Sequence, residues 1–457
     1  MGPKRMKNVV SDSSDPATFR PDLPPATKTG AKFYGMKLPD FQPKINLPSS
    51  ISPLNAWEIF RLFIPTEIIC QIVNNTNEKV AQEDMEDLAP YSRLKRWKPV
   101  TCEDIYVYIG IRIYMGLNIQ SDMREYWATG QNKPHYNLSD VMAKDRFLAI
   151  HTRMRVADPD PNAEFGAVFD RLEPLNAHIR ETSLKLWTPG RDVAIDEGMS
   201  PFEGRSYDTL VIKGKPIEEG YKIWILAQKG YFLTWCFHRK GKIKDNGSRG
   251  RLGPWKVPQP KALGENNSSA VVAYLMEQVP HAGYILYLDN LFTNVKLLTY
   301  MRERGVGIIG TASTKSGILE DFCEKKAKDS KKDTIPWGTL YHEPSQDGKI
   351  MFIAWKDNAL VLFMTNVHGM LEMVESRRKR PSETSTSAKI VRVPFGDKPT
   401  AILEIPSLDD KYNHKMGAVD QGNKLKAEYT LQRSHRRGGH HSLITWLLET
   451  ALLMPIS

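Results

Sequence analysis

The sequence has little cysteine and no apolar run long enough for a membrane span. These two features argue against a disulfide-stabilised protein, a zinc finger and a membrane-spanning protein. Its four cysteines, scattered through 457 residues, form no C-x-x-C pair. This argues against a disulfide framework or a zinc finger, so no zinc site is expected, and it fits a reducing compartment. The apolar stretch IYVYIGIRIYMGL is short and contains Arg112, which predicts a buried helix and no membrane partner. The start, MGPKRMKN, has no signal-peptide pattern.

Basic residues outnumber acidic ones, and they are spread along the chain. Lysine and arginine total 63 against 53 acidic residues, which gives a net charge of +10. This distribution favours a polyanionic partner, DNA or RNA, although charge alone leaves open a basic surface that is merely solvated. Hydrophobic residues make up 41% of the chain, which is enough to bury a large interior in two or three packed units.

The first half of the chain is predicted to be mostly helical. A Pro-, Ser- and Lys-rich arm comes first, and helical spacing of apolar residues then runs from about residue 52 to 188. Thr101 and Asp104 resemble a capping box that opens a helix over CEDIYVYIGIRIYMGL. Further helices are expected over SDVMAKDRFLAIHTRMRV and FDRLEPLNAHIRETSLKLW.

After residue 190 the pattern changes to that of a mixed sheet. RDVAIDEG begins a strand, and YKIWILAQKGYFLTWCFHRKGK predicts two strands joined at Lys229-Gly230. After a loop over 241–268, SSAVVAYLMEQV predicts a helix, YILYLDNLF a buried strand, NVKLLTYMRERG a helix and VGIIGTAS a strand. This order suits an α/β fold with helices on the faces of the sheet.

Residues 314–390 interrupt this pattern and are interpreted as an insertion. They hold the hydrophilic run CEKKAKDSKKD, a strand pair over GKIMFIAWKDN and LVLFMTNVHG, and the basic polar stretch ESRRKRPSETSTSAK. The run Arg377-Arg378-Lys379-Arg380 before proline is typical of a nuclear localisation signal, although an exposed basic loop that touches DNA is an alternative. The last part of the chain is expected to be helical, with a basic Gly-rich loop inside it.

Three aspartates stand where a metal site could form. Asp196 lies in AIDEG on the first strand of the sheet region, Asp289 ends the apolar strand ILYLD, and Asp420 follows YNHKMGAV. A carboxylate at the end of a buried strand is costly unless something pairs with it, and a divalent metal is one such partner. Aspartate is also common in turns and caps, and the spacing alone does not bring the three together.

Four segments of the chain resemble PiggyBac transposases. AIDEGMSPFEGRS, followed by KGKPIEEGYKIW, resembles the first catalytic block of that family, YLDNLFTNVKLL the second, and YNHKMGAVDQ the third. RLKRWKPVTCEDIYVYIGIRIYMGL, with DRFLAIHTRMRV after it, resembles the helical region upstream. The order and spacing of these motifs cover roughly residues 53–450.

The resemblance implies a fold and a reaction. It implies a ribonuclease-H-like mixed sheet core, flanked by a mostly helical domain for dimerisation and DNA binding, with Asp196, Asp289 and Asp420 as catalytic residues and metal ligands. The metal is expected to be Mg²⁺, with Mn²⁺ as a substitute. The implied reaction is cut-and-paste transposition into TTAA target DNA, a series of phosphoryl transfers by a homodimer in the nucleus.

The same resemblance divides the chain into segments. These are a disordered N-terminal arm (1–51), a first helical part (52–190), a first part of the catalytic core (191–313), the insertion (314–390), a second part of the core (391–424), and a second helical DNA-binding part that ends short of the family's usual C-terminal helix (425–457).

Further residues are assigned to metal or DNA. Asn423 stands where the family has a fourth aspartate and is a candidate metal ligand without charge. Arg433, Arg436 and Arg437, beside the glycines of the loop RSHRRGG, are candidate phosphate contacts, as are Arg205 and Lys222 near the first aspartate; the last two are equally interpretable as surface charges. Two alternative functions remain open: a domesticated DNA-binding protein that has lost the chemistry, and a general nuclease of the same fold.

Overall fold

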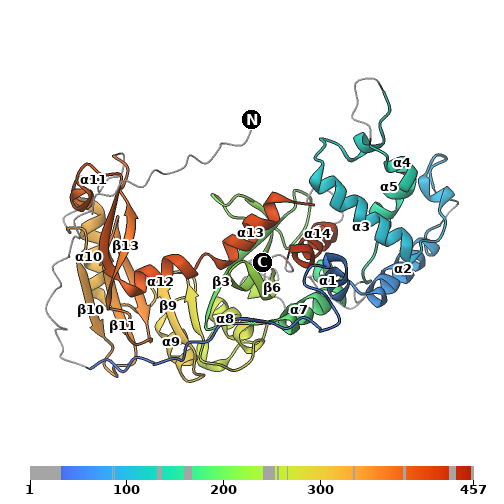
Figure 1. The fold of residues 1–457 in the computed structure, drawn as a ribbon. Coiled ribbons are helices and arrows are strands. Elements are labelled where there is room, and N and C mark those ends of the chain that lie inside the picture. The colour runs from blue at the N-terminus through green and yellow to red at the C-terminus, as the bar shows by residue number, and fades with distance from the viewer. Residues whose placement is uncertain are drawn as a thin grey trace, which may run out of the picture. The chain divides into compact units, whose positions relative to one another are not determined.

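The structure is a computed structural model of the chain, and its contacts divide the chain into two compact units (Figure 1). It describes residues 32–84, 86, 88–130, 136–158, 167–239, 253–254, 257–264, 266–332, 335–383, 388–431 and 439–453. The large unit comprises Leu38–Phe292, Glu303–Gly307 and Lys415–Ser457. The small unit comprises Met1–Lys37, Thr293–Arg302 and Ile308–His414.

Helices form the first part of the large unit, as the apolar spacing predicts. The capping box at the start of α3 is present, with the Thr101 side chain accepting from the Asp104 N–H and the Asp104 side chain accepting from the Thr101 N–H. The segment SDVMAKDRFLAIHTRMRV, expected as one helix over 139–156, instead lies in two helices separated at Met142 and Ala143. The helices are α1 (Ala56–Phe63), α2 (Thr66–Ala81), η1 (Arg93–Arg96), α3 (Cys102–Leu117), η2 (Met123–Trp127), α4 (Leu138–Val141), α5 (Lys144–Arg153), α6 (Ala167–Asp170) and α7 (Leu175–Leu186).

A mixed sheet forms the second part of the large unit. In it β8 runs parallel to β3, and β3, β5, β6 and β7 follow in antiparallel pairs, with β4 beside β5. The predicted turn at Lys229 and Gly230 joins β5 to β6, with φ of 51° and 90°, as a tight hairpin turn requires. The strands are β3 (Asp192–Pro201), β4 (Leu210–Val211), β5 (Glu219–Gln228), β6 (Tyr231–Arg239), β7 (Gly253–Pro254) and β8 (Ile285–Leu288); a separate pair is β1 (Lys44–Ile45) and β2 (Trp187–Thr188).

Helices cover this sheet, which explains why its strands are apolar along their length. Every residue of β8 is buried, and so is all of β6 except its last residue. The helices that contact the sheet are α7, α8 (Asn267–Glu277), α13 (Ala418–Glu428) and α14 (Gly439–Leu453), and the short η3 (Lys261–Leu263) precedes α8. None of the described helices is long and apolar enough to cross a membrane.

The small unit contains an antiparallel sheet, in the order β10-β11-β12-β9, and a two-stranded ribbon of β13 and β14. The strand pair predicted over GKIMFIAWKDN (348–358) and LVLFMTNVHG (360–369) is confirmed as β11 and β12. The elements are α9 (Val295–Arg302), β9 (Gly307–Thr311), α10 (Glu320–Lys332), β10 (Leu340–Pro344), β11 (Met351–Lys356), β12 (Leu360–Thr365), β13 (Met373–Lys379), α11 (Ala388–Val391), η4 (Val393–Phe395), β14 (Thr400–Pro406) and α12 (Ser407–Lys415).

Two hydrophilic segments of the small unit are more regular than expected. The residues CEKKAKDSKK lie in α10, and the part of the basic stretch that contains Arg377 and Arg378 lies in the strand β13. Arg378 is ion-paired with Asp357 and lies 3.4 Å from Asp409, whereas Arg377 is exposed. The basic run is therefore an edge of a paired ribbon and not an unstructured loop.

Candidate metal centre

The parallel pairing of β3 with β8 brings two of the predicted aspartates together. In this pair Ile195 lies beside Leu288, the last residue of β8. Asp196 and Asp289 are the next residues on the two segments, and both are half-buried. Because the strands are parallel, the two carboxyl groups reach the same carboxyl-terminal edge, which is where open α/β sheets bind ligands.

Glu197 is the third acid at this edge. One carboxylate oxygen from each of Asp196, Glu197 and Asp289 lies within 4.8 Å of the others, and among the described residues no other three His, Cys, Asp or Glu side chains gather in this way. The N–H of Glu197 donates to Asp196 Oδ1 at 2.8 Å, and the N–H of Leu291 donates to Asp289 Oδ1 at 2.9 Å. We call these three residues the carboxylate cluster.

Two lysines lie beside the carboxylate cluster, and both are ion-paired with Glu197. Lys215 Nζ lies 3.2 Å from Glu197 Oε1, and Lys222 Nζ lies 3.9 Å from Oε2. Burial acts to raise the pKa of Glu197, but Lys222 and Lys215 outweigh burial and hold this pKa below its ordinary value. Glu197 Oε2 is buried without a hydrogen-bond donor, so part of its ligand capacity is unused.

The two aspartates of the cluster resist ionisation. Burial, and after it the charge of Glu197, raises the pKa of Asp196 to about 7. Burial also raises the pKa of Asp289; the Leu291 N–H partly offsets it, and the charge of Glu197 adds to it. Holding three carboxylates here in their charged forms therefore costs free energy that the two lysines do not fully offset.

The donor set of the cluster fits a hard divalent cation. Carboxylate oxygens are the ligands that Mg²⁺ and Mn²⁺ prefer in proteins, and an added positive charge would favour the ionised forms of Asp196 and Asp289. Glu197 Oε2, which faces Lys222 at 3.9 Å but accepts no hydrogen bond, is a further oxygen that such a cation could use. The three residues thus suit a metal on their chemistry as well as on their spacing.

Asp420 and Asn423 lie on α13, which packs against β3 where a glycine allows a close approach. A Cβ added at Gly198 would lie 3.5 Å from Asn423 Oδ1 and 2.7 Å from Ile225 Cδ1, so a larger residue would displace these neighbours. Asp420 is exposed. Burial acts to lower the pKa of Lys215, but the charges of Glu197, Asp196 and, last, Asp420 outweigh burial and raise this pKa above its ordinary value.

Asp420 and Asn423 share a hollow with one member of the carboxylate cluster. The hollow has a volume of about 820 Å³, and Glu197, Lys215, Asp420 and Asn423 contribute to its lining. Neither Asp420 nor Asn423 belongs to the group within 4.8 Å. The structure therefore brings Asp196 and Asp289 into one cluster. Asp420 lies outside that cluster and lines the same hollow as Glu197.

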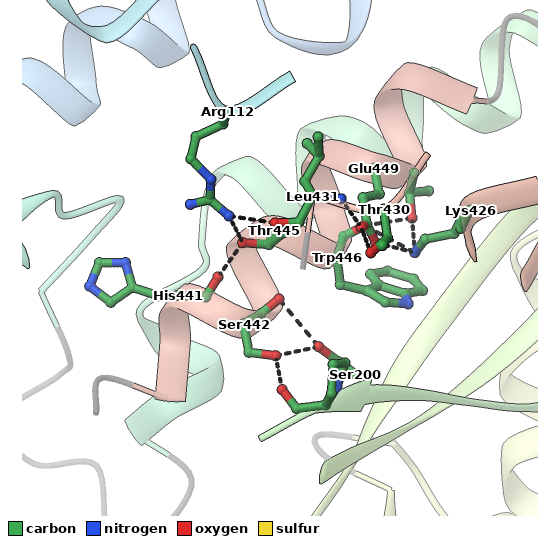
Figure 2. Close-up of polar contacts among 12 residues, drawn as sticks. Arg112, Ser200, Lys426, Thr430, Leu431, His441, Ser442, Thr445, Trp446 and Glu449 are labelled. Atoms are coloured by element: carbon green, nitrogen blue, oxygen red, sulfur yellow. Dashed lines mark hydrogen bonds and ion pairs between the residues drawn. The ribbon is translucent and has the colours of Figure 1, made fainter. Parts of the chain in front are cut away.

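The helix α14, which contributes Trp446 and Glu449 to the lining of this hollow, is hydrogen-bonded both to α3 and to β3 (Figure 2). On α3, Arg112 donates to the Leu431 carbonyl at 2.7 Å and to Thr445 Oγ1 at 3.3 Å. At the start of α14, the hydroxyls of Ser442 and Ser200 of β3 lie 2.7 Å apart. One helix thus connects the helical part to the strand that carries Asp196.

A buried lysine on α13 completes this network. Lys426 Nζ donates to the Trp446 carbonyl at 3.2 Å and to Thr450 Oγ1 at 3.1 Å, and it lies 3.8 Å from Glu449 Oε2 (Figure 2). Burial lowers the pKa of Lys426 to about 7, and the Glu449 carboxylate only partly opposes this. Sequence reasoning missed Glu197, Lys215 and Lys426; the adjacent acids of AIDEG are the signal that could have found the first.

The remaining predicted residues have separate surroundings. Arg205 is exposed in the loop between β3 and β4, and Lys222 lies over the Trp224 ring at 3.9 Å as well as beside Glu197. The predicted phosphate contacts in the basic loop, Arg433, Arg436 and Arg437, lie outside the described residues.

Comparison with known proteins gives a consistent set of relatives. A family model described as Transposase IS4 matches residues 55–453. Human PiggyBac transposable element-derived protein 2 is 23% identical over 399 residues, which cover 86% of this chain and 60% of that protein. Human PiggyBac transposable element-derived protein 3 is 25% identical over 377 residues, which cover 81% of this chain and 56% of that protein. The chain therefore spans somewhat more than half the length of these relatives.

The fold is also similar to a solved structure. A cryo-EM structure of the piggyBac transposase synaptic complex with hairpin DNA aligns with a TM-score of 0.65 and 20% sequence identity. The alignment covers 88% of this chain and 73% of that chain. At this identity the likeness establishes a shared mixed α/β fold.

Proposed function

This chain belongs to the PiggyBac transposase family, and from that premise we propose that its large unit carries out metal-dependent phosphoryl transfer on DNA. The observation that carries the proposal is the carboxylate cluster, which forms where β8 ends beside the middle of β3 and where three acids lie near two lysines. Acids left short of positive charge at a sheet edge are typical of a site that receives a cation.

The residues of the chain have separate roles in this proposal. Asp196 and Asp289 supply the ligand oxygens, and Glu197 is a candidate third ligand in addition to the predicted Asp420 and Asn423. Lys215 and Lys222 keep Glu197 ionised and lie where a DNA phosphate would meet positive charge. A bound Mg²⁺ or Mn²⁺ would polarise the scissile phosphate and stabilise the charge that develops during transfer.

The hollow beside Glu197 gives the proposal a place for the DNA strand. Its lining includes the exposed Asp420 and the buried Trp446 and Lys426. We propose that a nucleotide flanking the reacting phosphate lies here, because apolar walls with a few charged groups suit a base and its backbone.

The finer expectations from the sequence are part of the same proposal. They are a ribonuclease-H-like core in residues 191–313 and 391–424, an insertion over 314–390, DNA-binding helical parts in 52–190 and 425–457, cut-and-paste joining at TTAA, double-stranded DNA as the partner, a homodimer, and a nuclear location. The similarity of the fold to a transposase solved with hairpin DNA supports the choice of DNA as the partner.

The test is cleavage of supercoiled plasmid DNA that carries TTAA sites by the whole chain, with and without Mg²⁺ or Mn²⁺. We expect cation-dependent nicking that Asp289→Ala abolishes. Asp192→Asn is the matched control, because Asp192 lies on β3, as Asp196 does, but outside the cluster, where Tyr287 Oη donates to its Oδ1 at 2.9 Å. This variant should retain the activity.

The other outcomes identify the alternatives. Salt-sensitive DNA binding without cleavage at any concentration of either cation would indicate a transposase-derived DNA-binding protein, and it would overturn the proposed chemistry. Cation-dependent cleavage without sequence preference would indicate a general nuclease of the same fold.

A further inference from the structure

Two cysteines in the helical part of the large unit lie in direct contact. Cys70 lies on α2 and Cys102 is the first residue of α3, and their Sγ atoms are 3.0 Å apart although 32 positions separate them in the chain. Both side chains are half-buried, so a small reagent can reach them. The scattered cysteines of the sequence gave no sign of this pair.

The backbone around the two thiols is held in place by independent contacts. Asn77, also on α2, donates through Nδ2 to the Val100 carbonyl at 3.0 Å and accepts from the Val100 N–H at 2.8 Å. The capping box of Thr101 and Asp104 then fixes the first turn of α3. The two sulfurs are therefore neighbours because two anchored segments place them there.

We propose that Cys70 and Cys102 form a reversible disulfide that links α2 to the start of α3. A disulfide has an S–S length of about 2.05 Å, so closure needs the two sulfurs to approach by roughly 1 Å.

The oxidant in this proposal is a small-molecule disulfide such as oxidised glutathione. The Cys70 thiol loses its proton and attacks one sulfur of the reagent, releasing one glutathione thiolate and leaving a mixed disulfide on Cys70. The Cys102 sulfur, after losing its proton, attacks the Cys70 sulfur and releases the second glutathione. Two protein thiols are thereby oxidised by two electrons, and one glutathione disulfide is reduced to two thiols.

The order of the two attacks follows from the contact between the sulfurs. The hydrogen bond with Cys70, followed by burial, raises the pKa of Cys102 to about 11, so this thiol stays protonated at neutral pH. Cys70 is therefore expected to attack first, and Cys102 to resolve the mixed disulfide.

The crosslink would close a loop that carries a basic surface. Lys95, Arg96 and Lys98 are exposed between the two cysteines and line a hollow of about 580 Å³ with Trp97. Arg146 of α5 lies 5.2 Å from the centre of the Trp97 ring. Oxidation would restrict the motion of this basic segment, and reduction would release it.

The experiment treats the reduced whole chain with mixtures of reduced and oxidised glutathione, traps free thiols with an alkylating reagent and maps the peptides by mass spectrometry. We expect a peptide pair linked through Cys70 and Cys102, while Cys236 and Cys323 remain alkylated. The unfolding temperature of the oxidised chain should exceed that of the reduced chain, because the crosslink restricts the unfolded state.

Matched variants separate the proposed pair from general oxidation. Cys323→Ser should keep the crosslink and the rise in unfolding temperature, whereas Cys70→Ser should lose both. The proposal is overturned if Cys70 and Cys102 stay alkylated across all mixtures, or if each ends as a separate glutathione adduct. Neither result depends on DNA cleavage, so the outcome is independent of the proposed function.

Discussion

Buried acids in the two units are balanced in different ways. In the small unit Asp329 faces Lys356 at 2.8 Å, with only 4% and 0% of their side chains exposed, and it also accepts from the Ile335 N–H. In the large unit three acids of the carboxylate cluster share Lys215 and Lys222, and both lysines pair with Glu197.

This difference distinguishes a charge that stabilises the fold, that of Asp329, from charges that are available to bind a ligand, those of the carboxylate cluster. A buried acid matched by one buried cation and a backbone donor is satisfied within its own fold. The raised pKa values of Asp196 and Asp289 indicate, by contrast, that their charged forms are not satisfied by the chain alone. A cation from solution would balance the charge of the carboxylate cluster, whereas the charge of Asp329 is already balanced by Lys356.

The largest expected effect on stability comes from breaking the buried ion pair between Asp329 and Lys356. Lys356→Met leaves the Asp329 carboxylate buried without its cation, which should lower the free energy of unfolding of the small unit by about 3–5 kcal/mol. Urea unfolding measures the loss. As a control, Lys328→Met removes an ion pair with Glu324 whose side chains are 76% and 60% exposed, and it should change little. Equal losses of unfolding free energy in the two variants would show that the buried Asp329–Lys356 pair stabilises the small unit no more than an exposed pair does.

A buried histidine, His441, shows the cost of a positive charge that the fold does not balance. Burial, and after it Arg112, Arg155 and Arg171, lowers the pKa of His441 to about 4. Between pH 6.5 and 4 the unfolded chain therefore binds a proton that the folded chain does not, and His441 should cost about 3 kcal/mol of stability as the pH falls through this window.

His441→Phe tests this expectation. Its free energy of unfolding should fall less steeply between pH 6.5 and 4 than that of the unchanged chain, although His440, whose pKa burial lowers to about 2, keeps part of the slope. Unfolding in urea at several pH values gives both slopes. Identical slopes would show that His441 titrates normally.

A smaller effect of opposite sign is expected within the cluster. Because the pKa of Asp196 is raised to about 7, the folded chain binds more protons than the unfolded chain from about pH 4 to 7, and stability is lost as the pH rises through this window. Asp196→Asn should therefore raise the free energy of unfolding at pH 8 by roughly 1–3 kcal/mol when divalent cations are chelated. A loss comparable to that of Lys356→Met would mean that the cluster is structural.

From the sequence, each strand of the site can be recognised separately, but the way the strands pair cannot. Asp289 could be found because a buried apolar strand ends at it, but the parallel register that places it beside Asp196 depends on contacts distant in the chain. Glu197 was missed because side chains alternate between the faces of a strand, so the neighbour of Asp196 is expected to point away. Only its observed position shows that its carboxylate joins the cluster.

The regular elements that were missed share a polar composition. In β13 the exposed Arg377 alternates with Arg378, whose charge is paired with acids of the same unit, so the strand lacks the apolar face on which recognition depends. In α10 only a few positions, among them Phe322 and Asp329, are buried. Tertiary ion pairs stabilise such segments, and composition does not reveal them.

The most direct test of the central claim is calorimetric titration of Mn²⁺ into the whole chain and its Asp196→Asn, Asp289→Asn and Asp192→Asn variants. We predict saturable binding in the unchanged chain and in Asp192→Asn, and loss of that binding in the two cluster variants. Binding of equal strength in all four proteins, or no binding in any, would show that the carboxylate cluster does not hold a divalent cation.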